Sequence, residues 1–142
     1  MMDLILLLIC LLLAFHAPNF LTIDNLLNIL RSISMLGLLA FGMTMVIIAR
    51  EIDLSVGSGA AFACCLVARL MAEGISPVLS IIITIVTLFC CGLFVGFMRG
   101  TFAVPSFITT LALFTGYRGM ALMLTGGFPV AINVSWYYYL GG

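Results

Sequence analysis

The chain has 142 residues, of which 65% are hydrophobic and only 7% carry a charged side chain, whereas a soluble domain has about 25% charged residues. A soluble globule of this length has no interior large enough to hide so much apolar surface, so the composition excludes that class and predicts an integral membrane protein. Five arginines balance five acidic residues, and nothing indicates a nucleic-acid partner.

Apolar runs separated by polar turns predict an all-α, polytopic membrane fold with about five transmembrane helices. The expected spans are residues 2–15, 33–49, 55–71, 78–98 and 106–124. About 20 residues cross a bilayer, so the first span is short and would be tilted or start further upstream. The first run lacks the basic start of a signal peptide, so we interpret it as a membrane helix. We expect residues 1–142 to form one transmembrane domain that ends in an extracytoplasmic loop, 125–142.

The segment between the first two spans is more polar than its neighbours. Pro18 should break the first helix, and either Thr22 or Asp24 can cap a helix that follows. We expect a short amphipathic helix here that lies along the membrane surface and connects the two spans.

The second span is short and contains two glycines and Thr44 before it reaches a charged turn. This pattern is typical of binding or translocation regions in transporters. Four polar groups, Thr44, Asp53, Ser55 and Thr109, are candidates for a translocation pathway. We expect them to turn toward the protein interior, because a side chain facing lipid would leave them unsatisfied.

The charged turn contains Arg50, Glu51 and Asp53 within four positions. A charge beside hydrocarbon costs roughly 2.5 to 3.5 kcal/mol, so such residues are usually paired, at an interface or facing a cavity. Asp53 or Ser55 can also cap the next helix. The stretch is therefore either a polar turn between membrane helices or part of a transport pathway.

The turn between the third and fourth spans has clear local signals. Gly74 suits a helix C-terminus, and Pro77 suits the first turn of the next helix. Arg69 and Glu73 are four residues apart, so we expect them to pair.

The five cysteines are Cys10 and the neighbouring pairs at 64–65 and 90–91, and the single histidine stands apart. This spacing does not predict a metal site. If the chain turns near Gly74, Cys90 lies roughly 7 Å too far along for a disulfide with the 64–65 pair. We interpret the cysteines as small packing residues.

The fourth span carries Gly92, Gly96 and Gly100 at four-residue steps, a pattern that predicts close packing of another helix. A loop should run from Arg99 to Pro105. In the fifth span, Arg118 should either reach the interface or face water in a cavity.

Several motifs occur in a characteristic order. They are Gly42-Met43-Thr44, Ile52-Asp53-Leu54-Ser55-Val56-Gly57, Val104-Pro105-Ser106-Phe107-Ile108-Thr109-Thr110-Leu111-Ala112, Arg118-Gly119 and Leu124-Thr125-Gly126-Gly127. Together they resemble the permease subunits of bacterial ATP-binding-cassette importers of the ribose, xylose and autoinducer branch. Members of that family often have two glycines where this chain has Arg50-Glu51, and many have Asn-Gly where it has Arg99-Gly100.

The resemblance implies a subunit that forms the translocation pathway for a pentose, a related monosaccharide or a sugar-derived signal in the bacterial inner membrane. Its implied partners are a second permease subunit in a homo- or heterodimer, two cytoplasmic ATPase subunits and a periplasmic sugar-binding protein. ATP would be bound by the ATPase, so no cofactor and no catalytic residue is expected on this chain. Family permeases are considerably longer, so we expect a truncated permease, a split gene product or a frameshift remnant.

Two other hypotheses stay open. One is a small helical membrane protein with an assembly role, or a remnant that does not transport. The other is a membrane-embedded enzyme that uses Glu51 and Asp53 as an acid/base pair, although residues two apart do not share a helix face and no nucleophile accompanies them.

The arginines also predict an orientation. Arg50 and Arg99 should lie on the cytoplasmic side, with Arg31 and the aromatic group at 136–139 on the other side.

Overall fold

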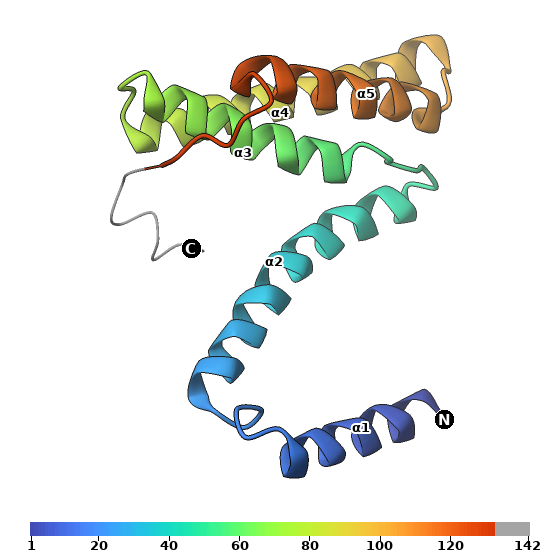
Figure 1. Ribbon diagram of the computed structural model, residues 1–142. Helices are drawn as coiled ribbons and strands as arrows, with labels where there is room; N and C mark the ends of the chain where they lie inside the picture. Colours follow the sequence, from blue (N-terminus) through green and yellow to red (C-terminus); the bar gives the residue numbers. More distant parts are fainter. Residues whose placement is uncertain (133–142) are drawn as a thin grey trace. The chain divides into compact units, whose positions relative to one another are not determined.

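The computed structural model describes residues 1–132, and this part of the chain is helical apart from its connecting segments. The helices are α1 (Met2–His16), α2 (Ile23–Ile48), α3 (Val56–Ala72), α4 (Pro77–Phe102) and α5 (Ser106–Thr125) (Figure 1). The predicted all-α fold is therefore confirmed. The aromatic group at 136–139 and most of the expected 125–142 loop lie outside the described residues.

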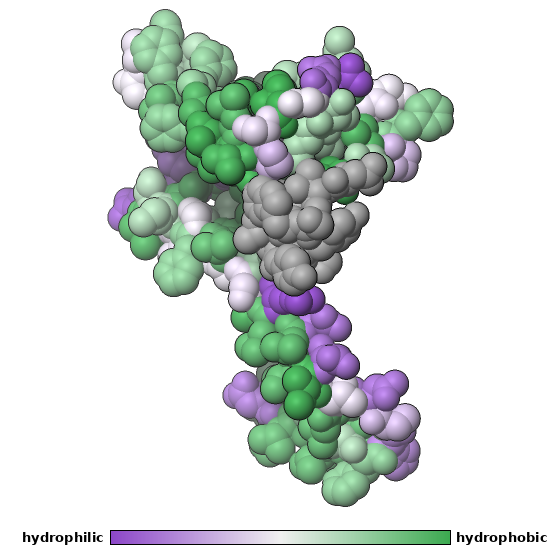
Figure 2. All heavy atoms as spheres, turned by 90° about the vertical axis from the view of Figure 1, so that its left-hand side faces the viewer, coloured by the Kyte–Doolittle hydropathy of each residue, from purple (hydrophilic) through white to green (hydrophobic). Residues whose placement is uncertain are grey.

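Apolar side chains cover the outside of the helices. Neither α1 nor α2 has a buried residue, and Figure 2 shows hydrophobic colouring over most of the visible face. Three helices, α2, α4 and α5, are long and apolar enough to cross a membrane, while α1 and α3 are shorter apolar helices. Such a surface is stable against lipid rather than water, so the chain is a membrane protein.

The first helix follows the sequence closely. It ends at His16, where the amide of Ala17 donates to the Leu13 carbonyl oxygen over 2.8 Å, just before the helix-breaking Pro18. Asp3 lies in its first turn, where a negative charge is favourable.

The expected short amphipathic helix between the first two spans is not a separate element. Thr22 does cap a helix, since its Oγ1 accepts a hydrogen bond of 3.3 Å from the Asn25 amide, but that helix then continues without a break to Ile48. The helix thus begins before residue 33, where we expected the span to begin, because the polar side chains around Arg31 lower the hydropathy without disturbing backbone hydrogen bonds. The bounds of the membrane span itself stay a prediction. A polar exposed face does not end a helix.

The chain divides into two parts, residues 1–41 and 42–142, and the second part contains a bundle of α3, α4 and α5. Phe62 of α3 and Tyr117 of α5 stack at its centre, with ring centroids 5.4 Å apart. Around this pair and Ala121 pack the partly buried Cys65, Leu66, Leu88, Cys91, Leu113 and Leu124. All five cysteines are free, and two of them serve the packing role expected from the sequence.

The turn between α3 and α4 agrees with its sequence signals. Gly74 has a φ of +87°, and its amide donates to the Met71 carbonyl oxygen over 3.0 Å. Pro77 begins α4. Arg69 and Glu73 form the expected ion pair at 2.9 Å.

The fourth helix is longer than predicted. It continues to Phe102 and ends at Ala103, which adopts a left-handed conformation with a φ of +54°. The loop expected from Arg99 to Pro105 is therefore only residues 103–105, because Arg99 and Gly100 extend the helix instead of ending it.

Candidate functional site

A sharp turn separates α2 from the polar stretch that follows it. Arg50 has a φ of +59°, its amide donates to the Ile47 carbonyl oxygen, and the Glu51 amide donates to that of Val46. This arrangement at a helix end normally has glycine at the left-handed position, and a side chain there costs roughly 1–2 kcal/mol. Arginine therefore occupies a backbone conformation that favours glycine.

Residues 51–55 have no helical or strand structure, and we call them the extended segment because they link α2 to α3 without a helical turn. Hydroxyl groups of α5 pair their backbone. The Ile52 amide donates to Ser106 Oγ over 3.1 Å, and the same hydroxyl is 3.1 Å from the Ile52 carbonyl oxygen. The Leu54 amide donates to Thr110 Oγ1 over 3.2 Å. Ser106 and Thr110 were in a recognised motif but had no predicted role; their spacing of four residues, which puts them on one helix face, could have identified them.

This extended segment lies alongside the first turns of α5, because α3 starts well past the beginning of α5. A Cβ added to Gly59, the fourth residue of α3, would be 3.4 Å from the ring of Tyr117, the twelfth residue of α5. At 1.5 Å per residue, α3 therefore begins about 12 Å along α5. The offset between the starts of the two helices can be followed in Figure 1. The two α5 hydroxyls thus supply hydrogen-bond partners for backbone that has none within a helix.

Asp53 and Ser55 are bonded to each other. Asp53 Oδ1 accepts hydrogen bonds of 2.7 Å from both the amide and the hydroxyl of Ser55. Ser55 is the N-cap residue of α3, but its side chain makes no cap hydrogen bond to the helix. The hydroxyl of Ser58 donates to the Ser55 carbonyl oxygen over 2.9 Å. The expected capping by Asp53 or Ser55 is thus replaced by a tight Asp53–Ser55 turn.

The four candidate pathway residues differ in burial. Ser55 and Thr109 are buried and Asp53 is half-buried, whereas Thr44 is exposed on α2. The first three belong to the extended segment or to the α5 turns beside it. Their part in a pathway stays a prediction.

An ion pair joins the first residue of the extended segment to α4. Arg99, in the last turn of α4, donates from Nε to Glu51 Oε1, so the two departures from the family pattern contact each other. Hydrogen bonding to Ser106 and the Arg99 guanidinium lower the pKa of Glu51. Glu51 thus pairs with Arg99 while Asp53 bonds Ser55, so each carboxylate has its own partner.

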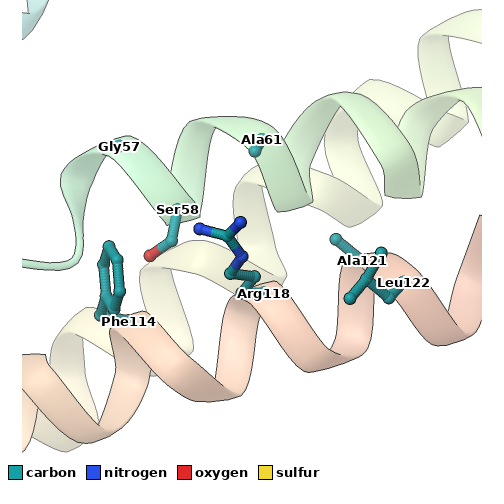
Figure 3. A pocket seen from close by; sticks show the side chains of 7 residues that line it. All are labelled: Gly57, Ser58, Ala61, Phe114, Arg118, Ala121 and Leu122. Carbon is teal, nitrogen blue, oxygen red and sulfur yellow. The ribbon is translucent and has the colours of Figure 1, made fainter. Parts of the chain in front are cut away.

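A pocket of about 350 Å³ lies between α3 and α5. Its lining consists of small and apolar residues with one serine and one arginine: Gly57, Ser58, Ala61, Phe114, Arg118, Ala121 and Leu122. Figure 3 shows the Arg118 side chain reaching from α5 toward α3, beside Ser58. Within residues 1–132, no carboxylate forms an ion pair with Arg118. Arg118 thus lines a cavity, and the choice between an interfacial and a water-facing position stays a prediction.

The glycine ladder of α4 faces away from the rest of the described chain. A Cβ added at Gly92, Gly96 or Gly100 would meet no atom within 4 Å. Packing of another helix on this face stays a prediction. In the described part of the chain, no three His, Cys, Asp or Glu side chains gather as metal ligands would.

Several curated proteins are similar to this chain. It is 41% identical over 113 residues to the ribose import permease protein RbsC of Bacillus subtilis, covering 80% of this chain and 35% of that protein. It is 34% identical to the probable ABC transporter permease protein YphD of Escherichia coli, covering 83% and 36%, and 36% identical to the autoinducer 2 import system permease protein LsrC of Photorhabdus laumondii, covering 68% and 29%. The chain thus spans about a third of the length of these relatives.

No solved structure matches the chain. A family model described as the permease component of branched-chain amino acid transport systems matches residues 25–137, a range that contains the extended segment, both α5 hydroxyls and the α3–α5 pocket. The resemblance first seen in short motifs therefore extends over most of the sequence, and the chain belongs to this family of transport-system permease components.

Proposed function

We propose that the chain is part of the transmembrane permease subunit of an ATP-binding-cassette importer that moves a sugar inward across the bacterial inner membrane. The substrate class is a pentose, a related monosaccharide or a sugar-derived signal. Its support is the likeness to the ribose and autoinducer 2 import permeases and the three helices that could span a membrane.

The observation that carries the proposal is the extended segment 51–55 alongside α5. Non-helical backbone next to membrane helices is tolerated where the segment has protein partners or lines a water-filled path, and interrupted helices build the binding regions of transporters. Asp53, half-buried in this segment, is the residue on which we base the test.

The proposed partners follow from this class of transporter. A second permease subunit, identical or different, would complete the pathway, two cytoplasmic ATPase subunits would bind and hydrolyse ATP, and a periplasmic binding protein would deliver the sugar. The chain itself would then hold no cofactor and no catalytic group.

Uptake of labelled ribose by cells that contain the complete importer, with this chain in its place in the permease, tests the proposal. Asp53→Ala should reduce uptake strongly, because the Ser55 amide and hydroxyl would lose their shared acceptor. Asp24→Ala is the matched control, since Asp24 is an exposed acid in the first turn of α2. Near-wild-type uptake with both variants would contradict the proposal.

A further inference from the structure

The pocket between α3 and α5 contains a charge that the described chain does not neutralise. Arg118 lies twelve residues after Ser106, about 18 Å along α5, with an otherwise largely apolar lining around it. On a helix that is long and apolar enough to cross a membrane, a charge away from both ends costs roughly 2.5 to 3.5 kcal/mol and is usually retained for a function. The question is which ligand the pocket suits.

The hydrogen-bond donors and acceptors of Arg118 and Ser58 indicate which ligand the pocket suits. A guanidinium can only donate, so Arg118 requires an acceptor. The hydroxyl hydrogen of Ser58 is already donated to the Ser55 carbonyl oxygen, so within the pocket Ser58 Oγ can only accept. A hydroxyl group satisfies both residues because it donates and accepts, whereas an ionised carboxylate or phosphate has no hydrogen to offer Ser58.

The rest of the lining suits a small ligand with an apolar face. Phe114 and Leu122 flank the polar pair, and Gly57 leaves open space where a side chain would be, since an added Cβ there meets nothing within 4 Å. The volume of about 350 Å³ lies at the lower end of the range for small-molecule sites, which combine apolar walls with a few orienting polar groups.

We propose that this pocket is a subsite for a neutral polyol, such as a monosaccharide. Neighbouring hydroxyl oxygens accept hydrogen bonds from the Arg118 guanidinium, one hydroxyl donates to Ser58 Oγ, and the C–H face of the ring lies on Phe114. The inference rests on the proposed function for its substrate class, but binding can be measured without transport.

The test is ligand binding to the purified chain in lipid nanodiscs, measured by saturation-transfer NMR. The probes are D-ribose, 2-deoxy-D-ribose, which lacks one of the neighbouring hydroxyls, and ribose 5-phosphate, which adds an anion. Ribose should bind best, and the deoxy sugar about tenfold more weakly, since one hydrogen bond to a charged group is lost. The phosphate should give no gain in affinity.

Variants then assign the subsite. Arg118→Gln and Ser58→Ala should each weaken ribose binding about tenfold, and Arg118→Lys should also weaken it, because lysine keeps the charge but loses the planar fork. Arg31→Gln is the matched control, an exposed arginine on α2. Arg118 is itself exposed, so its substitution leaves the α3–α5 packing intact even if Ser58→Ala fails to fold.

Three outcomes would overturn the proposal: no saturable ribose binding, equal binding by Arg118→Gln and Arg31→Gln, or tighter binding of the phosphate, which would make the pocket an anion site. Failure of the proposed function is a separate result. If ribose binding depends on Arg118 but Asp53→Ala does not change uptake, the subsite proposal stands and the proposed pathway is contradicted. If ribose binding does not depend on Arg118 but Asp53→Ala reduces uptake, only the subsite proposal is contradicted.

Discussion

Glu51 is held as a carboxylate by two neighbours, the hydrogen-bonding Ser106 and the Arg99 guanidinium, both of which lower its pKa below the ordinary value of 4.5. A carboxyl group whose pKa is lower in the folded state stabilises that state above the unfolded pKa, and this contribution disappears as the pH falls through the folded pKa. The contribution of the Glu51–Arg99 pair to folding stability should therefore be constant at neutral pH and decrease only below pH 4.5.

Glu51→Gln removes the charge of Glu51 and tests the predicted pH dependence of the stability. The difference in melting temperature between the variant and the parent chain in detergent should be the same from pH 8 to pH 5 and should vanish below pH 4.5. Glu73→Gln, which breaks the exposed Arg69–Glu73 pair instead, serves as the control. A difference for Glu51→Gln that grows with falling pH would contradict the assigned direction.

Arg50 offers a second prediction at the same scale. Its φ of +59° places a Cβ where glycine is unhindered, so Arg50→Gly should stabilise the fold by about 0.5–1 kcal/mol after the extra chain entropy of glycine is subtracted. Arg50→Ala removes the charge but keeps the Cβ and should give no such gain. Unfolding by SDS titration measures both, and equal effects of the two variants would show that charge, not backbone conformation, is responsible.

At the scale of elements, α5 supplies the hydrogen bonds that the extended segment lacks. Ser106→Ala together with Thr110→Val leaves the Ile52 and Leu54 amides without their partners, at a cost of about 0.5–1.5 kcal/mol for each hydrogen bond lost. The same titration should show this loss. Thr115→Ala, which removes an exposed hydroxyl bonded only within α5, should change stability by much less.

The glycine ladder of α4 predicts a contrast between the chain alone and the chain in an assembly. Because nothing lies within 4 Å of a Cβ added at Gly96, Gly96→Leu should not destabilise the isolated chain and should gain up to about 1 kcal/mol of helix propensity. The same change should weaken association with a partner helix if one packs there. Crosslinking in membranes measures that association, with Gly37→Leu on α2 as the comparison.

Local signals in the sequence were sufficient for features that depend on neighbouring residues. The caps at Thr22 and Gly74 and the Arg69–Glu73 pair follow from spacings of two to four residues. The position of the extended segment beside α5 could not be predicted, because it depends on Ser106 and Thr110, which are far away in the sequence. The continuity of α2 was missed for a different reason. Hydropathy indicates which residues suit lipid, and it does not indicate whether a helix continues.

At the scale of the whole molecule, the Glu51–Arg99 pair places the α2–α3 turn and the end of α4 together, as the alternation of spans predicts. If the arginines mark the cytoplasmic side, a cysteine at Thr101 should be labelled by an impermeant reagent only in inside-out vesicles. A cysteine at Ser76, in the turn at the opposite end of α4, should be labelled from outside. Both variants require a background without the five native cysteines, and the reversed pattern would invert the topology.

The pairing of the extended segment with α5 also determines when the protein can complete its insertion. Ile52 is synthesised 54 residues before the serine that bonds its amide and 58 residues before the threonine that bonds its carbonyl oxygen. At translation rates of ~5–20 residues per second, the interval is about 3–11 s. Until α5 emerges, the amide and carbonyl of Ile52 can hydrogen-bond only to water or to the insertion machinery, so this pairing forms after α5 is synthesised rather than in the order of synthesis.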